Sequence, residues 1–101
     1  MRQFNPPHPG EFIRSVYLDP YADKISRSEI ARRPGVARPT FNRLVKEQSN
    51  TSPEMAIRLS KVLGGSAQGW LYMQTQYDLY HAKKAARLNK LKKLDFDSLS
   101  A

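Results

Sequence analysis

Apolar residues recur along this chain at intervals of three and four positions, which is the spacing of one face of an α-helix. We find no run in which apolar and polar residues alternate strictly, as strands require. Helices are expected over residues 10–18, 27–33, 38–47, 53–63 and from 67 to beyond 81, after an extended proline-containing arm over residues 1–8. The pattern therefore predicts an all-α fold of five helices.

Local signals predict where these helices begin and end. Ser26 precedes Glu29 at the spacing of a capping box, in which the hydroxyl and the carboxylate each serve a backbone N–H. Ser52 and Ser66 are expected to cap the fourth and fifth helices. Pro9 is suited to the first helical position. The stops are expected at Asp19-Pro20, Pro34-Gly35 and Gly64-Gly65.

The apolar faces of the expected helices define a candidate core, which takes contributions from all five. Its members are Phe12, Ile13, Val16, Tyr17, Ile30, Ala31, Phe41, Leu44, Val45, Met55, Ile57, Leu59, Val62, Leu63, Trp70, Met73, Tyr77 and Tyr80. A core of this size fits one small domain of 101 residues.

Positive charge is concentrated in two parts of the chain. The net charge is +8, and residues 27–46 carry six basic residues against one acidic residue. Residues 81–101 carry six basic and two acidic residues. This distribution favours a polyanionic partner, although a simply solvated basic surface is the alternative.

Composition excludes several classes of protein. The chain has no Cys, which excludes disulfides, a Cys-ligated zinc site and a thiol nucleophile. No apolar run approaches 18 residues, and the N-terminal residues lack the apolar region of a signal peptide, so a cytoplasmic location without a membrane partner is expected. His8 and His81 have no partner carboxylate at ligand spacing, and no Gly-rich phosphate loop is present. We therefore expect neither an enzyme nor a cofactor.

The second and third expected helices are short and are joined by a tight turn that contains Gly35. A small Ala31 would let the helices cross closely, and Gly35 suits a positive φ in the turn. Ile30, Val36 and Phe41 are of a size to fill the wedge between them, together with Leu44. These features predict a helix-turn-helix, with an ordinary helical bundle as the alternative.

In a helix-turn-helix, the N-terminal residues of the second helix contact base edges in the major groove. Arginine pairs with guanine and asparagine with adenine, whereas residues at the start of the first helix hold phosphates. The expected DNA-binding residues are Arg27, Ser28, Arg38, Pro39, Thr40, Asn42, Arg43 and Lys46.

Five motifs follow one another over residues 8–80. They are His8-Pro9-Gly10-Glu11-Phe12, Ser28 to Arg33, Arg38-Pro39-Thr40, Ser52 to Lys61, and Trp70-Leu71 with Gln74, Tyr77, Asp78 and Leu79. In these motifs the chain resembles the HigA/VapI-type antitoxins, a branch of the Cro/C1-like helix-turn-helix proteins. The resemblance implies a five-helix homodimer that binds operator DNA, represses its own operon and neutralises a RelE-like (HigB-type) mRNA-cleaving toxin.

The fifth helix is expected to form the dimer interface. The residues assigned to it are Trp70, Leu71, Gln74, Tyr77 and Asp78, with core packing as the alternative role of Trp70. We expect a helix-turn-helix and dimerisation domain over residues 1–82 and a basic C-terminal helix extension or tail over residues 83–101. The tail could be solvated, contact DNA phosphates or lie on an anionic membrane.

Two other functions stay open at this point. A stand-alone helix-turn-helix regulator would need no toxin. A protein-interaction module with a vestigial helix-turn-helix is favoured by Pro34, which shortens the second helix, and by Ala37, which cannot cap the third.

Overall fold

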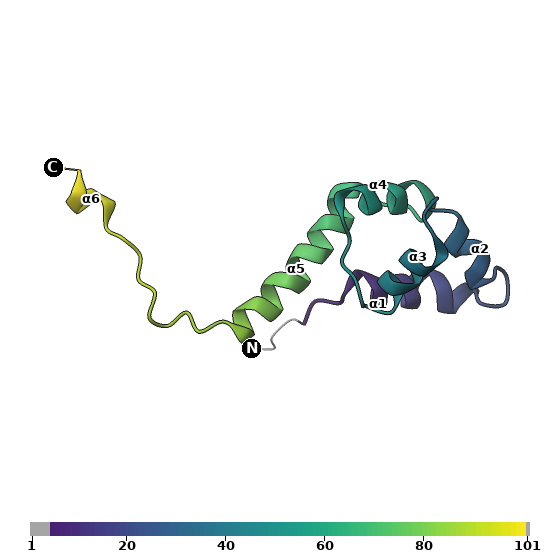
Figure 1. Ribbon diagram of the computed structural model, residues 1–101, viewed down its shortest axis with the longest axis horizontal. Coiled ribbons are helices and arrows are strands. Elements are labelled where there is room, and N and C mark those ends of the chain that lie inside the picture. Colours follow the sequence, from purple (N-terminus) through teal and green to yellow (C-terminus); the bar gives the residue numbers. More distant parts are fainter. Residues whose placement is uncertain (1–4, 101) are drawn as a thin grey trace.

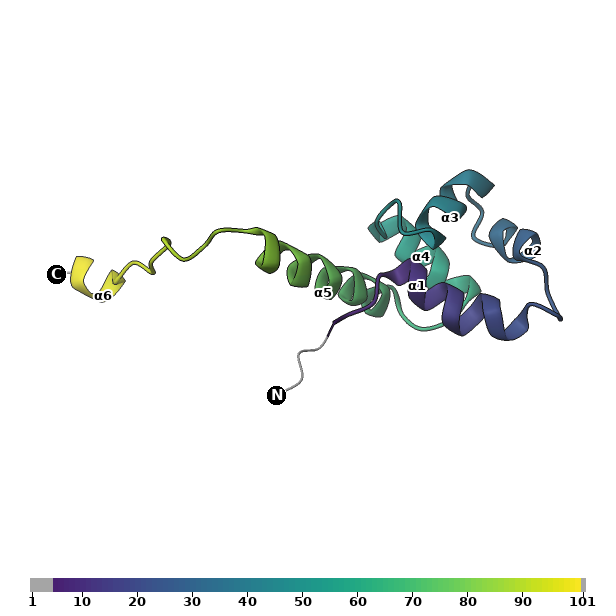
Figure 2. The same cartoon turned by 90° about the horizontal axis from the view of Figure 1, so that it is seen from below.

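The computed structural model describes residues 5–100, all of whose regular elements are helical. The helical elements before residue 63 form one body, and the longest helix leads away from it to the C-terminal part of the chain (Figures 1 and 2). In chain order the elements are α1 (Pro9–Ile13), the π-helical η1 (Arg14–Leu18), the 3₁₀-helical η2 (Asp19–Tyr21), α2 (Arg27–Arg32), α3 (Arg38–Val45), α4 (Pro53–Val62), α5 (Ala67–Ala85) and α6 (Phe96–Leu99). The predicted all-α class is confirmed.

The core lies where α1, η1, α2, α3 and α4 meet the start of α5. Its buried apolar members are Ile13, Leu18, Ile30, Ala31, Phe41, Leu44, Val45, Met55, Ala56, Leu59 and Trp70. Nine of the eighteen predicted core residues are among them, and Phe12, Tyr17 and Leu63 pack against this core while partly buried. Ile57 is not buried, because α4 turns Met55, Ala56 and Leu59 inward and leaves Ile57 52% exposed.

The first helix differs from the prediction in its second half. After α1 the backbone widens into η1, in which the N–H of Asp19 bonds the carbonyl of Arg14 five residues earlier. This wider turn rotates Val16 to the surface and buries Leu18 instead. The expected stop at Asp19-Pro20 is also wrong, because Pro20 lies in the first turn of η2, where its missing N–H is not needed.

The predicted serine caps are confirmed. The hydroxyls of Ser26, Ser52 and Ser66 accept hydrogen bonds from the backbone three residues ahead, at 3.1, 3.1 and 3.0 Å. The reciprocal half of the capping box is wrong, since the carboxylate of Glu29 accepts from Arg32 and Arg33 rather than turning back to Ser26. The hydrogen bond from Arg32 lowers the pKa of the Glu29 carboxyl below its ordinary value.

The chain beyond α5 is not a helical continuation. α5 ends at Ala85, and residues 86–95 form no helix before the short α6. Leu88, Leu91 and Leu94 are all more than half exposed, so no buried apolar stripe continues beyond α5. Phe96–Leu99 form α6, a single short helix with no buried residue. Within residues 5–100, no helix is both long and apolar enough to cross a membrane.

Candidate nucleic-acid interface

α3 is an amphipathic helix whose inner face is fixed in the core. Phe41, Leu44 and Val45 are each at most 5% exposed. The opposite face points to solvent at one edge of the helical body (Figure 2). It carries the exposed side chains of Arg38, Pro39, Asn42, Arg43 and Lys46, with Thr40 half-buried beside them. Because the buried side chains prevent α3 from rotating about its axis, core packing fixes the direction in which the polar face points.

The cations on this face are free to bind an external anion. Arg38, Arg43 and Lys46 form no ion pair with any residue in the range 5–100. Arg27, in the first turn of α2, contacts Asp19 at 3.1 Å, and both side chains are more than 60% exposed. Such an exposed pair contributes little stability, so a phosphate can replace the carboxylate. Ser28 is exposed in the same turn.

The turn between α2 and α3 is held by a side chain that local spacing did not reveal. Gly35 has a φ of 75°, as predicted. The Nη1 atom of Arg58, on α4, donates to the carbonyl of Pro34 at 2.9 Å. A Cβ on Gly35 would lie 2.7 Å from the same Nη1 atom. Arg58 belongs to the motif over residues 52–61, but nothing within that motif indicates a contact 24 residues away.

The C-terminal end of α3 is held by the first helix. Arg14 donates to the carbonyl of Val45 and forms an ion pair of 2.7 Å with Glu47. Glu47 itself has a left-handed φ of 63°. Gly10 lies directly against the carbonyl of Leu44, so closely that a Cβ would overlap that oxygen. These contacts fix α3 along its length.

His8 is the N-cap residue of α1. Its Nδ1 accepts a hydrogen bond of 2.9 Å from the backbone N–H of Gly10, and the side chain is 2% exposed. Burial lowers the pKa of the imidazole below its ordinary value of 6.5. Within residues 5–100, no group of three His, Cys, Asp or Glu is placed to hold a metal ion.

The residues expected at a dimer interface fall into two groups. Trp70 is 4% exposed and donates from Nε1 to the carbonyl of Gly64 at 3.0 Å. Gln74 is 5% exposed; its Oε1 accepts from the N–H of Thr51 at 2.7 Å, and its Nε2 donates to Asp78 at 3.0 Å. Both side chains are thus used within one chain, where Trp70 takes its alternative role in the core.

The other three residues retain solvent-accessible surface. Leu71 and Tyr77 are half-buried and Asp78 is exposed. The Tyr77 ring packs edge-on against His8, with centroids 4.9 Å apart, and also contacts His81.

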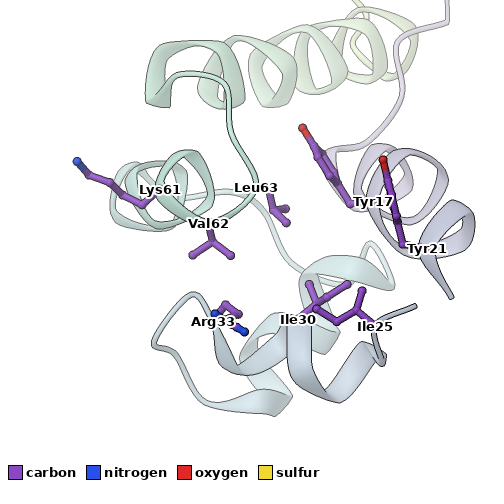
Figure 3. A pocket seen from close by; sticks show the side chains of 8 residues that line it. All are labelled: Tyr17, Tyr21, Ile25, Ile30, Arg33, Lys61, Val62 and Leu63. Carbon is purple, nitrogen blue, oxygen red and sulfur yellow. The ribbon is translucent and has the colours of Figure 1, made fainter. Parts of the chain in front are cut away.

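A groove of about 470 Å³ lies between η1, α2 and the end of α4 (Figure 3). Its lining is mainly apolar, with Arg33 and Lys61 as its cationic members, and Tyr17 and Tyr21 stand along one side. It is separate from the exposed face of α3, since the two share no residue.

The arrangement of α2, a glycine turn and α3 with an outward polar face defines a helix-turn-helix protein. No family model matches the chain. It is 40% identical over 77 residues to virulence-associated protein I of Dichelobacter nodosus, covering 76% of this chain and 69% of the relative. By this similarity the chain belongs to the HigA/VapI-type family of helix-turn-helix proteins.

Solved structures agree. The Pseudomonas aeruginosa antitoxin HigA, determined with the higBA promoter, is 41% identical with a TM-score of 0.71 and covers 79% of this chain and 85% of its own. A second P. aeruginosa protein, in complex with its operator DNA, is 36% identical with a TM-score of 0.79 and covers 91% and 100%. These relatives are an antitoxin bound to its promoter and a protein bound to its operator. The Cro/C1-like helix-turn-helix class expected from the sequence is confirmed.

Proposed function

We propose that this protein is a homodimeric, operator-binding autorepressor and the antitoxin of a RelE-like (HigB-type) mRNA-cleaving toxin. The observation that carries the proposal is the outward face of α3, where unpaired cations and an amide lie opposite a buried apolar face. It is supported by the two relatives whose structures contain promoter or operator DNA.

Each residue of the proposed interface has a role that follows from its chemistry. Arg38 and Arg43 would pair with guanine, and Asn42 with adenine, in the major groove. Thr40 would contact a phosphate or a thymine methyl group, beside Pro39 at the start of the helix. Arg27, Ser28 and Lys46 would hold phosphates and so fix the position of the domain on the duplex.

The dimer would be formed through α5. Leu71, Tyr77 and Asp78 would contact the partner, whereas Trp70 and Gln74 would support that surface from within the chain. One helix-turn-helix reads few base pairs, but two placed about 34 Å apart read successive major grooves. The helix-turn-helix and dimerisation unit is assigned to residues 1–82 and the basic tail to residues 83–101.

Substitutions on α3 test the DNA-binding part of the proposal. Arg38→Ala or Arg43→Ala should each weaken binding to the chain's own promoter by about 1–3 kcal/mol and relax base preference at one position per half-site. Lys46→Ala should weaken all duplexes alike and reduce the salt slope by about 1. Fluorescence anisotropy with promoter and unrelated duplexes measures both effects. Lys61→Ala, an exposed cation on α4, is the control. If neither arginine change alters promoter affinity, α3 is not the reading helix.

Co-expression tests the toxin. Cells that express a RelE-like toxin from a reading frame next to this gene should resume growth when the chain is supplied. Arg43→Ala should still rescue growth, because toxin binding and base reading are separate properties. A stand-alone regulator is the second candidate, favoured by the net charge of +8, which opposes association with a basic partner. Absence of such a reading frame together with intact promoter binding would identify it.

A further inference from the structure

The most strongly charged stretch of the chain lies outside the helix-turn-helix. Residues 83–93, here called the basic segment, contain six cations and no acidic residue: Lys83, Lys84, Arg87, Lys90, Lys92 and Lys93. All six side chains are exposed, and none forms an ion pair with a residue in the range 5–100. Lys84 lies over the ring of Tyr80, with its Nζ 5.1 Å from the ring centroid, but no carboxylate within residues 5–100 pairs with any of the six cations.

The backbone conformation of the basic segment bears on what it can bind. Beyond Ala85 it is not helical, apart from one turn in which the N–H of Leu91 bonds the carbonyl of Leu88 at 3.0 Å. An amphipathic helix that lies on a membrane needs its apolar residues on one continuous face. Leu88, Leu91 and Leu94 form no such face here. Charge, rather than apolar area, is therefore what this segment offers.

The position of the basic segment sets which part of a duplex it can reach. α5 has 19 residues and is about 28 Å long; its first turns pack on the helical body through the buried Trp70 and Gln74, and its C-terminal part leads away (Figure 1). Residues 86–93 can extend up to about 27 Å further. The cations thus lie away from the exposed face of α3, beyond the bases that α3 would contact. A duplex nevertheless presents one phosphate charge for about every 1.7 Å of its length, whatever its sequence.

We propose that the basic segment binds the phosphates of duplex DNA next to the operator and adds affinity that does not depend on sequence. This inference rests on the proposed DNA binding and extends it to a second surface. Five of the six cations are lysines, which are compact point charges without the planar fork that recognises guanine, so the segment strengthens operator and unrelated duplexes equally. Its binding releases counterions and makes the affinity steeper in salt.

Two interleaved triple variants of the full-length chain test the proposal. In one, Lys90, Lys92 and Lys93 are changed to Gln; in the other, Leu88, Leu91 and Leu94 are changed to Gln. Anisotropy titrations over a range of salt concentrations use the promoter duplex and an unrelated duplex of equal length. The lysine variant should lower the slope of log affinity against log salt by about 2.7 for both duplexes. The leucine variant should leave that slope unchanged.

The outcomes separate this inference from the proposed function. An unchanged slope in the lysine variant, or an equal loss of affinity in the leucine variant, would overturn it. So would tighter binding of the unmodified chain to phosphatidylserine vesicles than to unrelated duplex at equal phosphate concentration. If the unmodified chain does not prefer its promoter, the proposed repressor function fails, yet the slopes still decide whether the basic segment binds phosphates. If the unmodified chain prefers its promoter and the lysine variant has the same salt slope as the unmodified chain, only the inference fails and the proposed function stands.

Discussion

Gly10 marks the closest approach of α1 to α3. A Cβ at this position would overlap the carbonyl oxygen of Leu44 and crowd that of Val45, and a backbone carbonyl cannot swing aside like a side chain. Gly10→Ala should therefore lower the free energy of unfolding by more than about 2 kcal/mol, because α1 must move off α3. Urea unfolding followed by circular dichroism measures the change.

Gly69→Ala is the matched control, since Gly69 lies in the first turn of α5 and an added Cβ would meet only the hydroxyl of Ser66 at 3.2 Å. A change within about 1 kcal/mol is expected there, because alanine also favours the helix. Equal losses of unfolding free energy in the two variants would show that the close approach of α1 to α3 does not determine the cost of Gly10→Ala.

His8 makes the stability of the fold sensitive to acid. In the folded chain its Nδ1 accepts from Gly10, and burial holds the pKa below the value of 6.5 that the side chain regains on unfolding. The unfolded state therefore binds the proton first as the pH falls. The contribution of His8 to the free energy of unfolding should therefore be constant above pH 6.5. It should decrease as the pH falls from 6.5 to the pKa of His8 in the folded chain.

The substitution His8→Asn isolates this effect, because asparagine also caps helices but does not titrate. Chemical unfolding between about pH 8 and pH 5.5 should show a steeper loss of stability in the unmodified chain than in His8→Asn. Parallel profiles would mean that the imidazole titrates alike in both states.

At the scale of elements, the sequence predicts the features that depend on residues close together along the chain. The serine caps, the positive φ of Gly35 and the inward stripe of α3 were all predicted, because each depends on residues within one or two turns. The contacts of Arg14 and Arg58 were not, because they join residues 31 and 24 positions apart. The wide turn of η1 likewise has no local signal, so Val16 was placed in the core although it is 40% exposed.

α3 begins without a side-chain cap, and this defect can be repaired. Ala37 has the extended backbone of a cap residue, with φ −59° and ψ 141°, but no side-chain oxygen to accept from the first turn. Ala37→Ser should raise the free energy of unfolding by about 1 kcal/mol. Thermal unfolding measures this, with Ser26→Ala expected to cause a loss of similar size at the capped end of α2.

The effect of Ala37→Ser on DNA binding separates two views of the helix-turn-helix. If α3 reads DNA, a better-ordered start to that helix should leave promoter preference intact. Gain of stability with loss of promoter binding would mean that the uncapped end itself contacts the duplex.

At the scale of the molecule, positive charge lies in two separate places. One is the α2–α3 region and the other is the basic segment beyond α5, which leads away from the helical body (Figures 1 and 2). The first surface is fixed on a packed core and suits base reading, which needs side chains at defined positions. The second is exposed throughout and suits phosphates, which repeat along any duplex. In the proposed function, base reading would belong to the α2–α3 region alone, whereas phosphate binding would be shared between that region and the basic segment.

The proposed dimer makes a prediction about operator geometry that needs no substitution in the protein. Two α3 helices held about 34 Å apart can enter successive major grooves only when both half-sites face the same side of the duplex. Five base pairs inserted between the half-sites turn one of them to the opposite side. One copy of α3 then loses its base contacts, which for two arginine pairs and one asparagine pair are worth about 3–9 kcal/mol.

Anisotropy with the altered promoter measures the loss of affinity, and five base pairs inserted outside the operator serve as the control. The loss should be the same in the variant that lacks Lys90, Lys92 and Lys93, because the basic segment contacts phosphates without regard to register. Analytical ultracentrifugation of the complex should give two chains per intact operator. If the inner insertion has no effect, the chain binds each half-site independently, and a dimer joined rigidly through α5 would be the wrong description of how the two copies meet.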